Sequence, residues 1–309
     1  MVTHTAGKTR TLVAGVEIPL LGFGTYLIPD AEADAAVSAA IDAGYRHIDT
    51  AELYQNEEGV GRALKASLPK HGLTRDDIFI TTKISPGNPA WGQTPRTTAT
   101  TIAQLDNSLH KLGLDHVDLY LIHATFQKEA RIAQWAGMVE LLKQGKAKAV
   151  GVSNFNGSHI DDLVEAGLPL PHANQIELHP WSQKPELVRY LDDKGIVPIA
   201  YSSLVPLSTW RTGNGDTGKS EQMKKESGAD GVFAVMAKKY GVSESRLLLR
   251  WAVQLGWPVL PKSTKPERIK DNADLFSFVI DDADMKAIAT MDKGRGVAWG
   301  TQPDPVTNA

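Results

Sequence analysis

Residues 44–54 read GYRHIDTAELY, a short apolar run that ends in a carboxylate, Asp49, with a phenol, Tyr54, five residues later. The run predicts a buried strand, which would place Asp49 at the strand end and Tyr54 in the loop that follows. A rigid scaffold can hold side chains at such positions against a ligand. Each residue alone also has a plain structural interpretation, as a turn or cap aspartate and as a packed or surface tyrosine. The other strand ends of the chain decide between these interpretations.

The composition is that of a globular protein. Hydrophobic residues make up 42% of the 309 residues and charged residues 22%, which provides enough apolar side chains for a sizeable core. The formal net charge of −3 gives no reason to expect a nucleic acid or a membrane surface as partner. The absence of cysteine excludes a disulfide framework, a thiolate nucleophile and a cysteine-based zinc site.

The start of the chain carries no targeting signal that we can identify. Arg10, Glu17 and Pro19 interrupt the apolar runs of residues 1–24, and no small-residue cleavage pattern follows them. We therefore expect neither a signal peptide nor a spanning segment, and we predict a cytoplasmic protein that is a monomer or a small homo-oligomer.

Strand and helix patterns alternate along the whole chain. Candidate strands begin near Leu20, Arg46, Ile78, Val117, Ala147, Ala173, Ile196 and Trp257, and a helical pattern follows most of them. Units of this kind, each roughly 25 to 40 residues long, predict an α/β fold with a parallel sheet closed on itself, the (β/α)8 or TIM barrel. An open doubly wound sheet is the alternative. In the barrel interpretation, residues 1–309 form a single domain.

Three further segments are expected around the barrel. Residues 10–19 alternate apolar and polar side chains, which predicts an N-terminal β-hairpin. The stretch from Ser208 to Gly231 is rich in Gly, Ser and charge and predicts a long loop inserted after the seventh strand. The stretch from Asp281 to Asp292 predicts an extra C-terminal helix with its apolar face inward, formed by Met285, Ile288 and Met291.

Three successive predicted strands end in titratable side chains. The second strand delivers Asp49 and then Tyr54, the third ends in Lys83, and the fourth ends in His123. In a parallel barrel the carboxyl ends of all strands face one mouth, and adjacent strands lie about 4.8 Å apart, so a lysine stem can reach its neighbours. Each residue alone fits a solvated or structural role, but their coincidence at neighbouring strand ends favours an active site.

These four groups suit proton donation to an oxygen atom. A free tyrosine has a pKa of about 10, and a nearby ammonium lowers it, so we expect Lys83 to make Tyr54 a better acid. Asp49 would keep Lys83 charged, and His123 would orient a carbonyl oxygen. None of the four can supply a hydride, so the chemistry requires a reduced nicotinamide and a small-molecule carbonyl substrate.

Several motifs together resemble those of the aldo-keto reductases. They are GYRHIDTAELYQNE, FITTK, DLYLIH, GVSNF, NQIELHP and PKSTKPERIKDN, which occur in the order and at the spacing of that family over nearly the whole chain. The resemblance implies a (β/α)8 barrel and reversible NADPH-dependent reduction of aldehydes and ketones. It also implies a catalytic tetrad of Asp49, Tyr54, Lys83 and His123, with Tyr54 as the acid.

The same resemblance assigns a cofactor site. Ser153, Asn154 and Gln175 match positions that hold the carboxamide, and Tyr201 offers a face on which nicotinamide can stack. Two cations and two hydroxyls after the last strand suit a 2′-phosphate and favour NADPH, while Asp271 leaves room for NADH. The residues of this phosphate site are Lys262, Ser263, Thr264 and Arg268. The remaining cofactor positions are Gly24, Thr25, Asp49, Ser202, Leu204 and Asn272.

The sequence departs from the family pattern around the substrate. Tyr26 and Ala124 stand where tryptophan is frequent, and Ser85 follows Lys83 by two residues, so we expect a wider substrate pocket. The segment from Ser85 to Pro95 is longer than usual, and its Trp91 is expected to supply a replacement wall. The identity of the substrate does not transfer.

Two other functions fit parts of the sequence. Residues 213–220 read GNGDTGKS and match a phosphate-loop pattern, but the buried strand and the helix that such a loop needs are not predicted on either side of it. A non-catalytic NADPH-binding regulatory module on the same barrel is the second alternative. No histidines have metal spacing, and we interpret His47 and His179 as structural, so no metal site is predicted.

Overall fold

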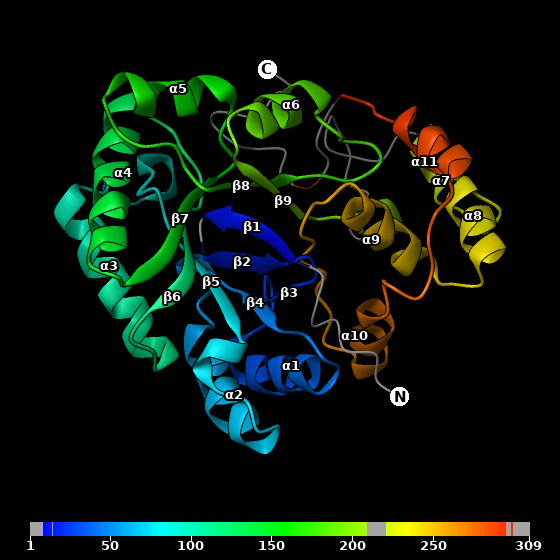
Figure 1. Ribbon diagram of the computed structural model, residues 1–309, viewed down its shortest axis with the longest axis horizontal. Helices are drawn as coiled ribbons and strands as arrows, with labels where there is room; N and C mark the ends of the chain where they lie inside the picture. The colour runs from blue at the N-terminus through cyan, green and yellow to red at the C-terminus, as the bar shows by residue number, and fades with distance from the viewer. Residues whose placement is uncertain (1–8, 14, 209–220, 295–297, 299–309) are drawn as a thin grey trace.

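The computed structural model describes residues 9–13, 15–208, 221–294 and 298, and in this part of the chain a curled parallel sheet is surrounded by helices (Figure 1). The sheet has seven strands, which pair in chain order. They are β3 (Phe23–Gly24), β4 (His47–Asp49), β5 (Phe79–Ile84), β6 (Val117–Ile122), β7 (Ala147–Ser153), β8 (Ala173–Glu177) and β9 (Val197–Tyr201). This order confirms the predicted barrel topology over the open, doubly wound sheet.

The eighth strand position is occupied by isolated bridges. Val259 bridges Leu21 on one edge of the sheet and Ala200 on the other, both in parallel orientation. Its amide donates to the Leu20 carbonyl at 2.9 Å. Pro258 and Pro261 flank this residue, and proline has no amide hydrogen to donate, so a regular ladder cannot extend here. The strand predicted from Trp257 is therefore present in position but short, and the barrel is not closed by a continuous ladder.

The strands divide the core into two clusters. Leu119 and Leu121 of β6 belong to a cluster that includes Phe79 and Ala149 from the neighbouring strands. Tyr120, between these leucines, belongs to the larger cluster shared with the helices. Alternate side chains of a strand point to opposite faces, so the first cluster fills the barrel and the second lies between barrel and helices.

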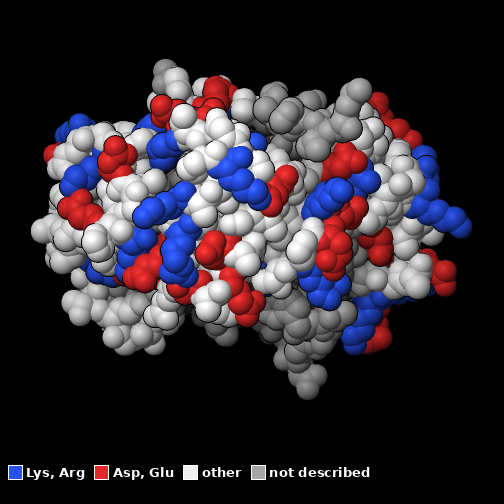
Figure 2. Space-filling model, turned by 90° about the horizontal axis from the view of Figure 1, so that it is seen from below, with Lys and Arg blue, Asp and Glu red and all other residues white. Residues whose placement is uncertain are grey.

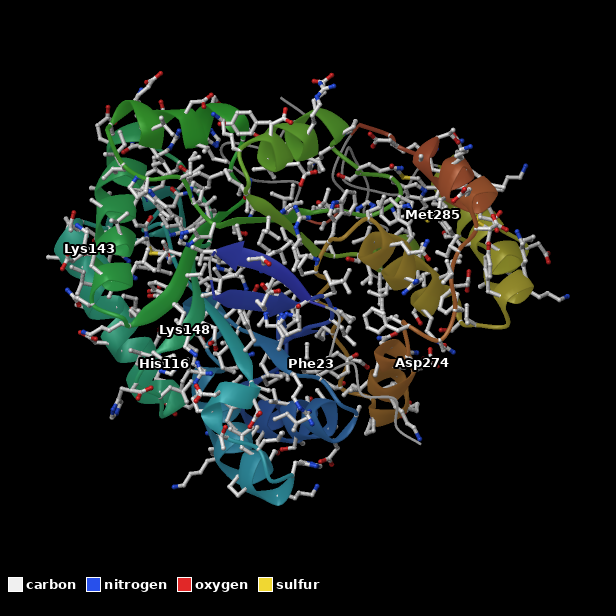
Figure 3. The ribbon with its side chains drawn as sticks, viewed as in Figure 1. Phe23, His116, Lys143, Lys148, Asp274 and Met285 are labelled. Atoms are coloured by element: carbon white, nitrogen blue, oxygen red, sulfur yellow. The ribbon has the colours of Figure 1, made fainter. Side chains whose placement is uncertain are left out.

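The helices lie outside the sheet and cover it (Figure 1). The longer ones are α1 (Asp30–Asp42), α2 (Glu57–Lys70), α3 (Thr98–Leu112), α4 (Lys128–Lys143), α5 (Gly157–Glu165), α6 (Pro185–Asp193), α8 (Val232–Tyr240), α9 (Glu244–Gln254), α10 (Pro266–Ala273) and α11 (Asp282–Ala289). Shorter turns are η1 (Glu52–Tyr54), η2 (Arg75–Asp77), η3 (Pro89–Trp91), η4 (Val205–Leu207) and α7 (Glu221–Glu226). Figure 3 shows Phe23 near the middle of the molecule and Lys143 on α4 at its rim.

The sequence explains why these helices form. In α1 the buried residues form one face, and they are Ala33, Ala36, Val37, Ala40 and Ile41. In α3, Thr97 and Thr100 make a capping box at the start, and Gly113 adopts the left-handed conformation at the end.

An N-terminal hairpin is confirmed. Strands β1 (Thr9–Val13) and β2 (Val16–Pro19) pair antiparallel, with Arg10 opposite Ile18. Leu12 and Ile18 are buried in the cluster that fills the barrel, together with Phe79 at the amino end of β5. The hairpin therefore covers the amino ends of the strands, and Figure 1 shows it across the curled sheet.

The structure describes part of the predicted inserted loop and the predicted C-terminal helix. Residues 209–220 of the predicted insertion lie outside the described residues, and the stretch after them forms α7, where the sequence predicted loop. The C-terminal helix is confirmed as α11, with Ile288 buried and Met285 partly buried against the core. It ends at Ala289, before the predicted Asp292, so the partly buried Met291 follows the helix.

The surface carries both signs of charge. On the face shown in Figure 2, Lys and Arg side chains alternate with Asp and Glu side chains. Such mixing is typical of a surface without a steering field for polyanions. Within the described residues, no helix is both long and apolar enough to cross a membrane.

The hairpin contact can be tested by truncating Ile18 to alanine. Ile18 is fully buried, so Ile18→Ala removes apolar contacts from the barrel interior and is expected to lower the free energy of unfolding by about 2–5 kcal/mol. Urea denaturation followed by circular dichroism measures the change. Val16→Ala on the same strand is the control, because Val16 is only half-buried, and its cost is expected to be about 1 kcal/mol or less. A cost of only about 1 kcal/mol or less for Ile18→Ala as well would contradict the packing of the hairpin into the barrel.

Candidate active site

Strand geometry brings the four predicted catalytic side chains together. Asp49 is the last residue of β4, Lys83 lies near the end of β5, and His123 follows β6. Tyr54 ends the turn η1, which follows β4. The strands β4, β5 and β6 are neighbours in the sheet, so these carboxyl ends face the same mouth.

Lys83 is the centre of this cluster. Its side chain is fully buried, and its ammonium donates to Asp49 Oδ1 at 2.5 Å and to the Thr50 carbonyl at 3.0 Å. The same nitrogen lies 3.5 Å from the Tyr54 hydroxyl oxygen and 5.0 Å from the centre of the phenol ring. The ring of His123 meets the Tyr54 ring edge to face, with centroids 5.4 Å apart.

Asp49 has a second partner that the sequence did not indicate. Its Oδ2 accepts a hydrogen bond of 2.8 Å from the side-chain amide of Gln175, in the middle of β8. Both carboxylate oxygens are thus engaged, one by Lys83 and one by Gln175. These two bonds fix the plane of the carboxylate.

The pKa of Tyr54 differs from the sequence-based expectation. Burial of the phenol raises the pKa of Tyr54 well above its ordinary value, and the Asp49 carboxylate and the tyrosines Tyr26 and Tyr201 raise it further. The residue as a whole is half-buried, but its hydroxyl points at the buried Lys83. Desolvation therefore outweighs the ammonium, and the expected lowering of this pKa is wrong. The phenol keeps its proton at neutral pH.

Burial also lowers the pKa values of the two basic groups. It lowers the pKa of Lys83, which the Asp49 carboxylate opposes. It lowers the pKa of His123 to about 3, and the positive charge of Lys83 lowers it further. His123 is therefore a neutral imidazole at physiological pH, which can still donate one hydrogen bond.

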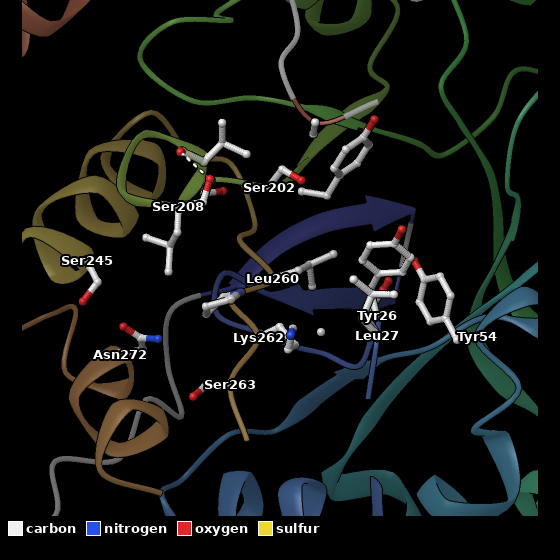
Figure 4. Close-up of a pocket in the computed structure, with 18 of the residues that line it drawn as sticks. Tyr26, Leu27, Tyr54, Ser202, Ser208, Ser245, Leu260, Lys262, Ser263 and Asn272 are labelled. Carbon is white, nitrogen blue, oxygen red and sulfur yellow. Dashed lines mark hydrogen bonds between the residues drawn. The ribbon is translucent and has the colours of Figure 1, made fainter. Parts of the chain in front are cut away.

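An elongated cavity connects this cluster to a cationic end. Its volume is about 990 Å³, and Tyr54 and Tyr26 lie at one end, whereas Ser245 and Asn272 lie at the other (Figure 4). All but one of the predicted cofactor residues line it, and they are Gly24, Asp49, Ser153, Asn154, Gln175, Tyr201, Ser202, Leu204, Lys262, Ser263, Thr264, Arg268 and Asn272.

Three predicted site residues do not line the cavity, and they are Thr25, Ala124 and the fully buried Lys83, which lies behind Asp49 and Tyr54. Thr25 is fully buried, and its hydroxyl donates to the Asp49 carbonyl at 3.0 Å, so it fixes the loop after β3 from behind. Ala124 is buried next to His123 and is likewise absent from the walls.

The middle of the cavity is a hydrogen-bonded network of amides and hydroxyls. Ser153 Oγ donates to the Gln175 carbonyl at 2.8 Å, and the Asn154 amide donates to the His123 carbonyl at 2.9 Å. The Tyr201 hydroxyl donates to Asn154 Oδ1 at 2.7 Å. This network presents donors and acceptors along one wall, as a carboxamide would require.

Strained backbone surrounds the same cavity. Leu27, Asn154 and Ser202 line it with φ values of 60°, 61° and 57°, and Gln55, beside Tyr54, has φ of 54°. Residues other than glycine seldom adopt this left-handed conformation, and it is concentrated at functional sites. Gly24 shows a related constraint, because a Cβ there would lie 2.8 Å from the Leu260 carbonyl oxygen.

The far end of the cavity combines cations with a buried amide. Lys262, Lys265 and Arg268 line it, beside Ser263 and Thr264. Asn272 is buried, and within the described residues its Oδ1 has no hydrogen-bond partner. A buried acceptor without a partner indicates a place where a ligand donates.

Several lining residues were missed by the sequence interpretation. They are Leu27, Leu53, Ser203, Val205, Leu207, Ser208, Ser243, Ser245, Leu260, Pro261, Lys265 and Ala298. Asp271, which the sequence placed beside the phosphate site, also lines the cavity. Asp271 accepts a hydrogen bond from Ser243 Oγ at 2.5 Å, so the start of α9 contributes to the far end. The only local signal was Ser243 as a helix cap, which does not indicate a binding role.

The predicted substrate residues lie at the catalytic end. Trp91 lines the cavity, and the ring of Tyr26 lies 5.2 Å from that of Tyr54. Tyr26, Leu27 and Leu53 are large apolar side chains that remain exposed, and all three line this cavity. Exposed apolar side chains gathered at one place mark a binding surface.

Two further sequence interpretations concern other parts of the chain. His47 is buried, with Nε2 2.9 Å from the Thr81 hydroxyl, and His179 Nε2 lies 2.7 Å from Glu177 Oε1, as structural histidines would. The phosphate-loop pattern at residues 213–220 lies outside the described residues, so its role stays a prediction.

A parallel barrel whose strand ends place a phenol and an imidazole in an elongated cavity, with a buried ammonium beside the phenol, defines a class of dinucleotide-dependent oxidoreductases. The chain matches the model of the Aldo/keto reductase family over residues 20–293, and it belongs to that family. Members of this family reduce carbonyl groups and use NAD(P)H.

Similar proteins cover nearly the whole chain. This chain is 38% identical over 333 residues to the aldehyde reductase YPR1 of Saccharomyces cerevisiae, with 96% of this chain and 97% of that protein covered. It is 36% identical over 297 residues to the glyoxal reductase of Bacillus subtilis, with 96% of each covered. The crystal structure of a Bombyx mori aldo-keto reductase in complex with NADP has a TM-score of 0.81 and 32% identity, with 94% of each chain covered.

The lowered pKa of His123 predicts how the free energy of unfolding depends on pH. The unfolded chain binds a proton at His123 below about pH 6.5, whereas the folded protein does so only near pH 3. The stabilising contribution of this neutral histidine is thus fully present above pH 6.5 and is lost as the pH falls toward 3. Between pH 6.5 and pH 5 the wild type is expected to lose about 2 kcal/mol more than His123→Asn, measured by urea denaturation. An NMR titration midpoint near 6.5 for His123 would contradict the assignment.

Proposed function

We propose that this protein reduces an aldehyde or ketone to an alcohol with NADPH, and that Tyr54 is the general acid. The observation that carries the proposal is the Tyr54 hydroxyl, 3.5 Å from a fully buried Lys83 that is paired with Asp49. Asp49, Tyr54 and His123 line one end of the elongated cavity, and Lys83 lies buried behind them. We also propose that residues 1–309 act as a single domain; the cytoplasmic location and the oligomeric state stay predictions.

The cavity fits a phosphorylated dinucleotide. The buried Asn272 Oδ1 can accept a hydrogen bond from a bound ligand. The cations Lys262, Lys265 and Arg268 line the same cavity and can bind a phosphate group. Ser153, Asn154 and Gln175 would hold the carboxamide, and the ring of Tyr201 would stack on the nicotinamide. The bound cofactor supplies the hydride, which no side chain of the chain can provide.

Residues of this chain supply the proton that the substrate oxygen receives. The raised pKa of Tyr54 keeps the phenol protonated at neutral pH, which is the state that a general acid needs. As negative charge develops on the substrate oxygen, Tyr54 transfers its proton there, and the ammonium of Lys83 stabilises the phenolate left behind. Asp49 holds Lys83 in place, and the neutral His123 donates a hydrogen bond that orients the carbonyl. The product is the alcohol.

Apolar carbonyl compounds fit the rim of the cavity. Tyr26, Leu27 and Leu53 would cover a hydrophobic substituent next to the carbonyl group. Relatives named aldehyde reductase and glyoxal reductase support an aldehyde as the reacting group. A non-catalytic regulatory module would instead bind NADPH without aldehyde-dependent oxidation, which absorbance of the nicotinamide distinguishes.

The acid is tested by Tyr54→Phe. This change removes the hydroxyl and keeps the ring, so kcat for an aldehyde is expected to fall by about 10²–10⁴-fold, while the Kd for NADPH changes little. Tyr26→Phe is the matched control, because it removes a hydroxyl from the ring beside Tyr54 and should retain most activity. Turnover that survives Tyr54→Phe would show that another group donates the proton.

Cofactor selectivity is tested by Arg268→Gln. Loss of this cation at the far end of the cavity is expected to raise the Kd for NADPH about tenfold, equivalent to about 1.4 kcal/mol, and to leave the Kd for NADH nearly unchanged. Fluorescence titration measures both constants. Lys270→Gln, which removes a charge from the same helix outside the cavity, is the control. Equal weakening of NADPH and NADH would contradict a 2′-phosphate contact.

A further inference from the structure

The loop between β5 and α3 is folded tightly on itself. Gln93 Oε1 accepts hydrogen bonds from Ser85 Oγ at 2.5 Å and from the Asn88 amide at 3.2 Å. Gly87 has φ of +71°, and a Cβ there would overlap the Thr94 carbonyl. This close packing gives residues 85–97 a defined shape, as in compact surface loops that carry function.

The side chain of Glu52 joins the two ends of this loop. Its Oε2 accepts from the Ser85 amide at 2.8 Å, at the start of the loop. Its Oε1 accepts from Arg96 Nη2 at 2.6 Å, at the end of the loop. The Glu52 and Arg96 side chains are 18% and 25% exposed, so this ion pair is more shielded from solvent than an ordinary surface pair.

The position of Glu52 links this loop to the candidate catalytic residues. Glu52 begins the turn η1 that Tyr54 ends, and Ser85 follows Lys83 by two residues. Trp91, on the short turn η3 within the loop, lines the cavity, whereas Glu52 does not. Glu52 therefore cannot contact a ligand in the cavity directly, and it acts through the residues that it holds.

We propose that Glu52 is a positioning residue that fixes the Trp91 wall against the Tyr54 turn and thereby sets which substrate groups fit. The proposal rests on the proposed carbonyl reduction at this site. Trp91 is the aromatic side chain that this loop contributes to the cavity, whereas Ala124, after β6, lines no part of it. A side chain on a loop moves unless the two ends of the loop are held in place. Glu52 holds both ends through its hydrogen bonds to Ser85 and Arg96.

The contribution of each end can be separated. Gln134 Nε2 also donates to the Ser85 carbonyl at 3.0 Å, so the start of the loop keeps one tie when Glu52 is changed. The end at Arg96 is the one that Arg96→Gln releases. We therefore expect Arg96→Gln to move the wall and to leave the Lys83 strand in place.

The experiment compares substrates of different size. The KM of Arg96→Gln and of Glu52→Gln for an aromatic aldehyde is expected to rise about fivefold to tenfold relative to that for a small aliphatic aldehyde, and kcat of Arg96→Gln is expected to change less than about twofold. Arg62→Gln is the matched control, because it breaks the exposed pair with Asp30 away from this loop. In a Trp91→Ala background, the Arg96 and Glu52 substitutions should no longer change the KM ratio.

Two results would overturn the proposal. One is an unchanged KM ratio in both variants. The other is an equal additional change in the Trp91→Ala background, since the effect would then not pass through the wall.

A second readout separates this proposal from the proposed reaction. Hydrogen exchange of the amides in residues 85–97 needs no substrate, and it is expected to accelerate in Arg96→Gln and not in Arg62→Gln. If the wild type reduces no carbonyl compound, the proposed function fails, and this exchange alone decides whether Glu52 and Arg96 hold the loop. Unchanged exchange would refute that role.

Discussion

The buried ion pair between Lys83 and Asp49 is the interaction on which the site depends. Removing an ammonium and a carboxylate from water is costly, and their attraction offsets that cost only when the geometry is good and the remaining hydrogen bonds are made. Here the Thr50 carbonyl and the Gln175 amide complete those bonds. The pair thus joins β4, β5 and β8 at the mouth of the barrel, and the phenol of Tyr54 is placed against a charge that cannot rotate away.

Much of this arrangement followed from the sequence because strand ends in a parallel barrel meet by geometry. The apolar runs located β4, β5 and β6, and the polar residues at their ends had to share a mouth. The bond from Gln175 to Asp49 was not predictable in the same way, since it joins side chains 126 positions apart through their exact rotamers. The direction of the Tyr54 pKa was also missed, because the cost of desolvation depends on how closely the pocket walls approach.

The loops were harder to predict than the strands. Pro258 and Pro261 reduce the eighth strand to a bridge, an effect visible in the sequence only once the neighbouring strands are known. Residues 85–97 acquire their shape from Gln93, Gly87 and Glu52 together, and no periodic pattern reports such contacts. The strands therefore determine where chemistry takes place, and the loops determine what reaches it.

Leu27 shows how far the rim of the cavity departs from the conformation that its sequence prefers. It is a leucine in the left-handed region, with φ of 60° and 57% of its surface exposed, where asparagine or glycine would be less strained. Selection for thermostability alone would therefore be expected to replace it. Leucine at this position makes the fold less stable but places an apolar side chain at the entrance of the cavity. Laboratory evolution for heat resistance is therefore expected to replace Leu27, whereas evolution for catalysis is expected to keep it.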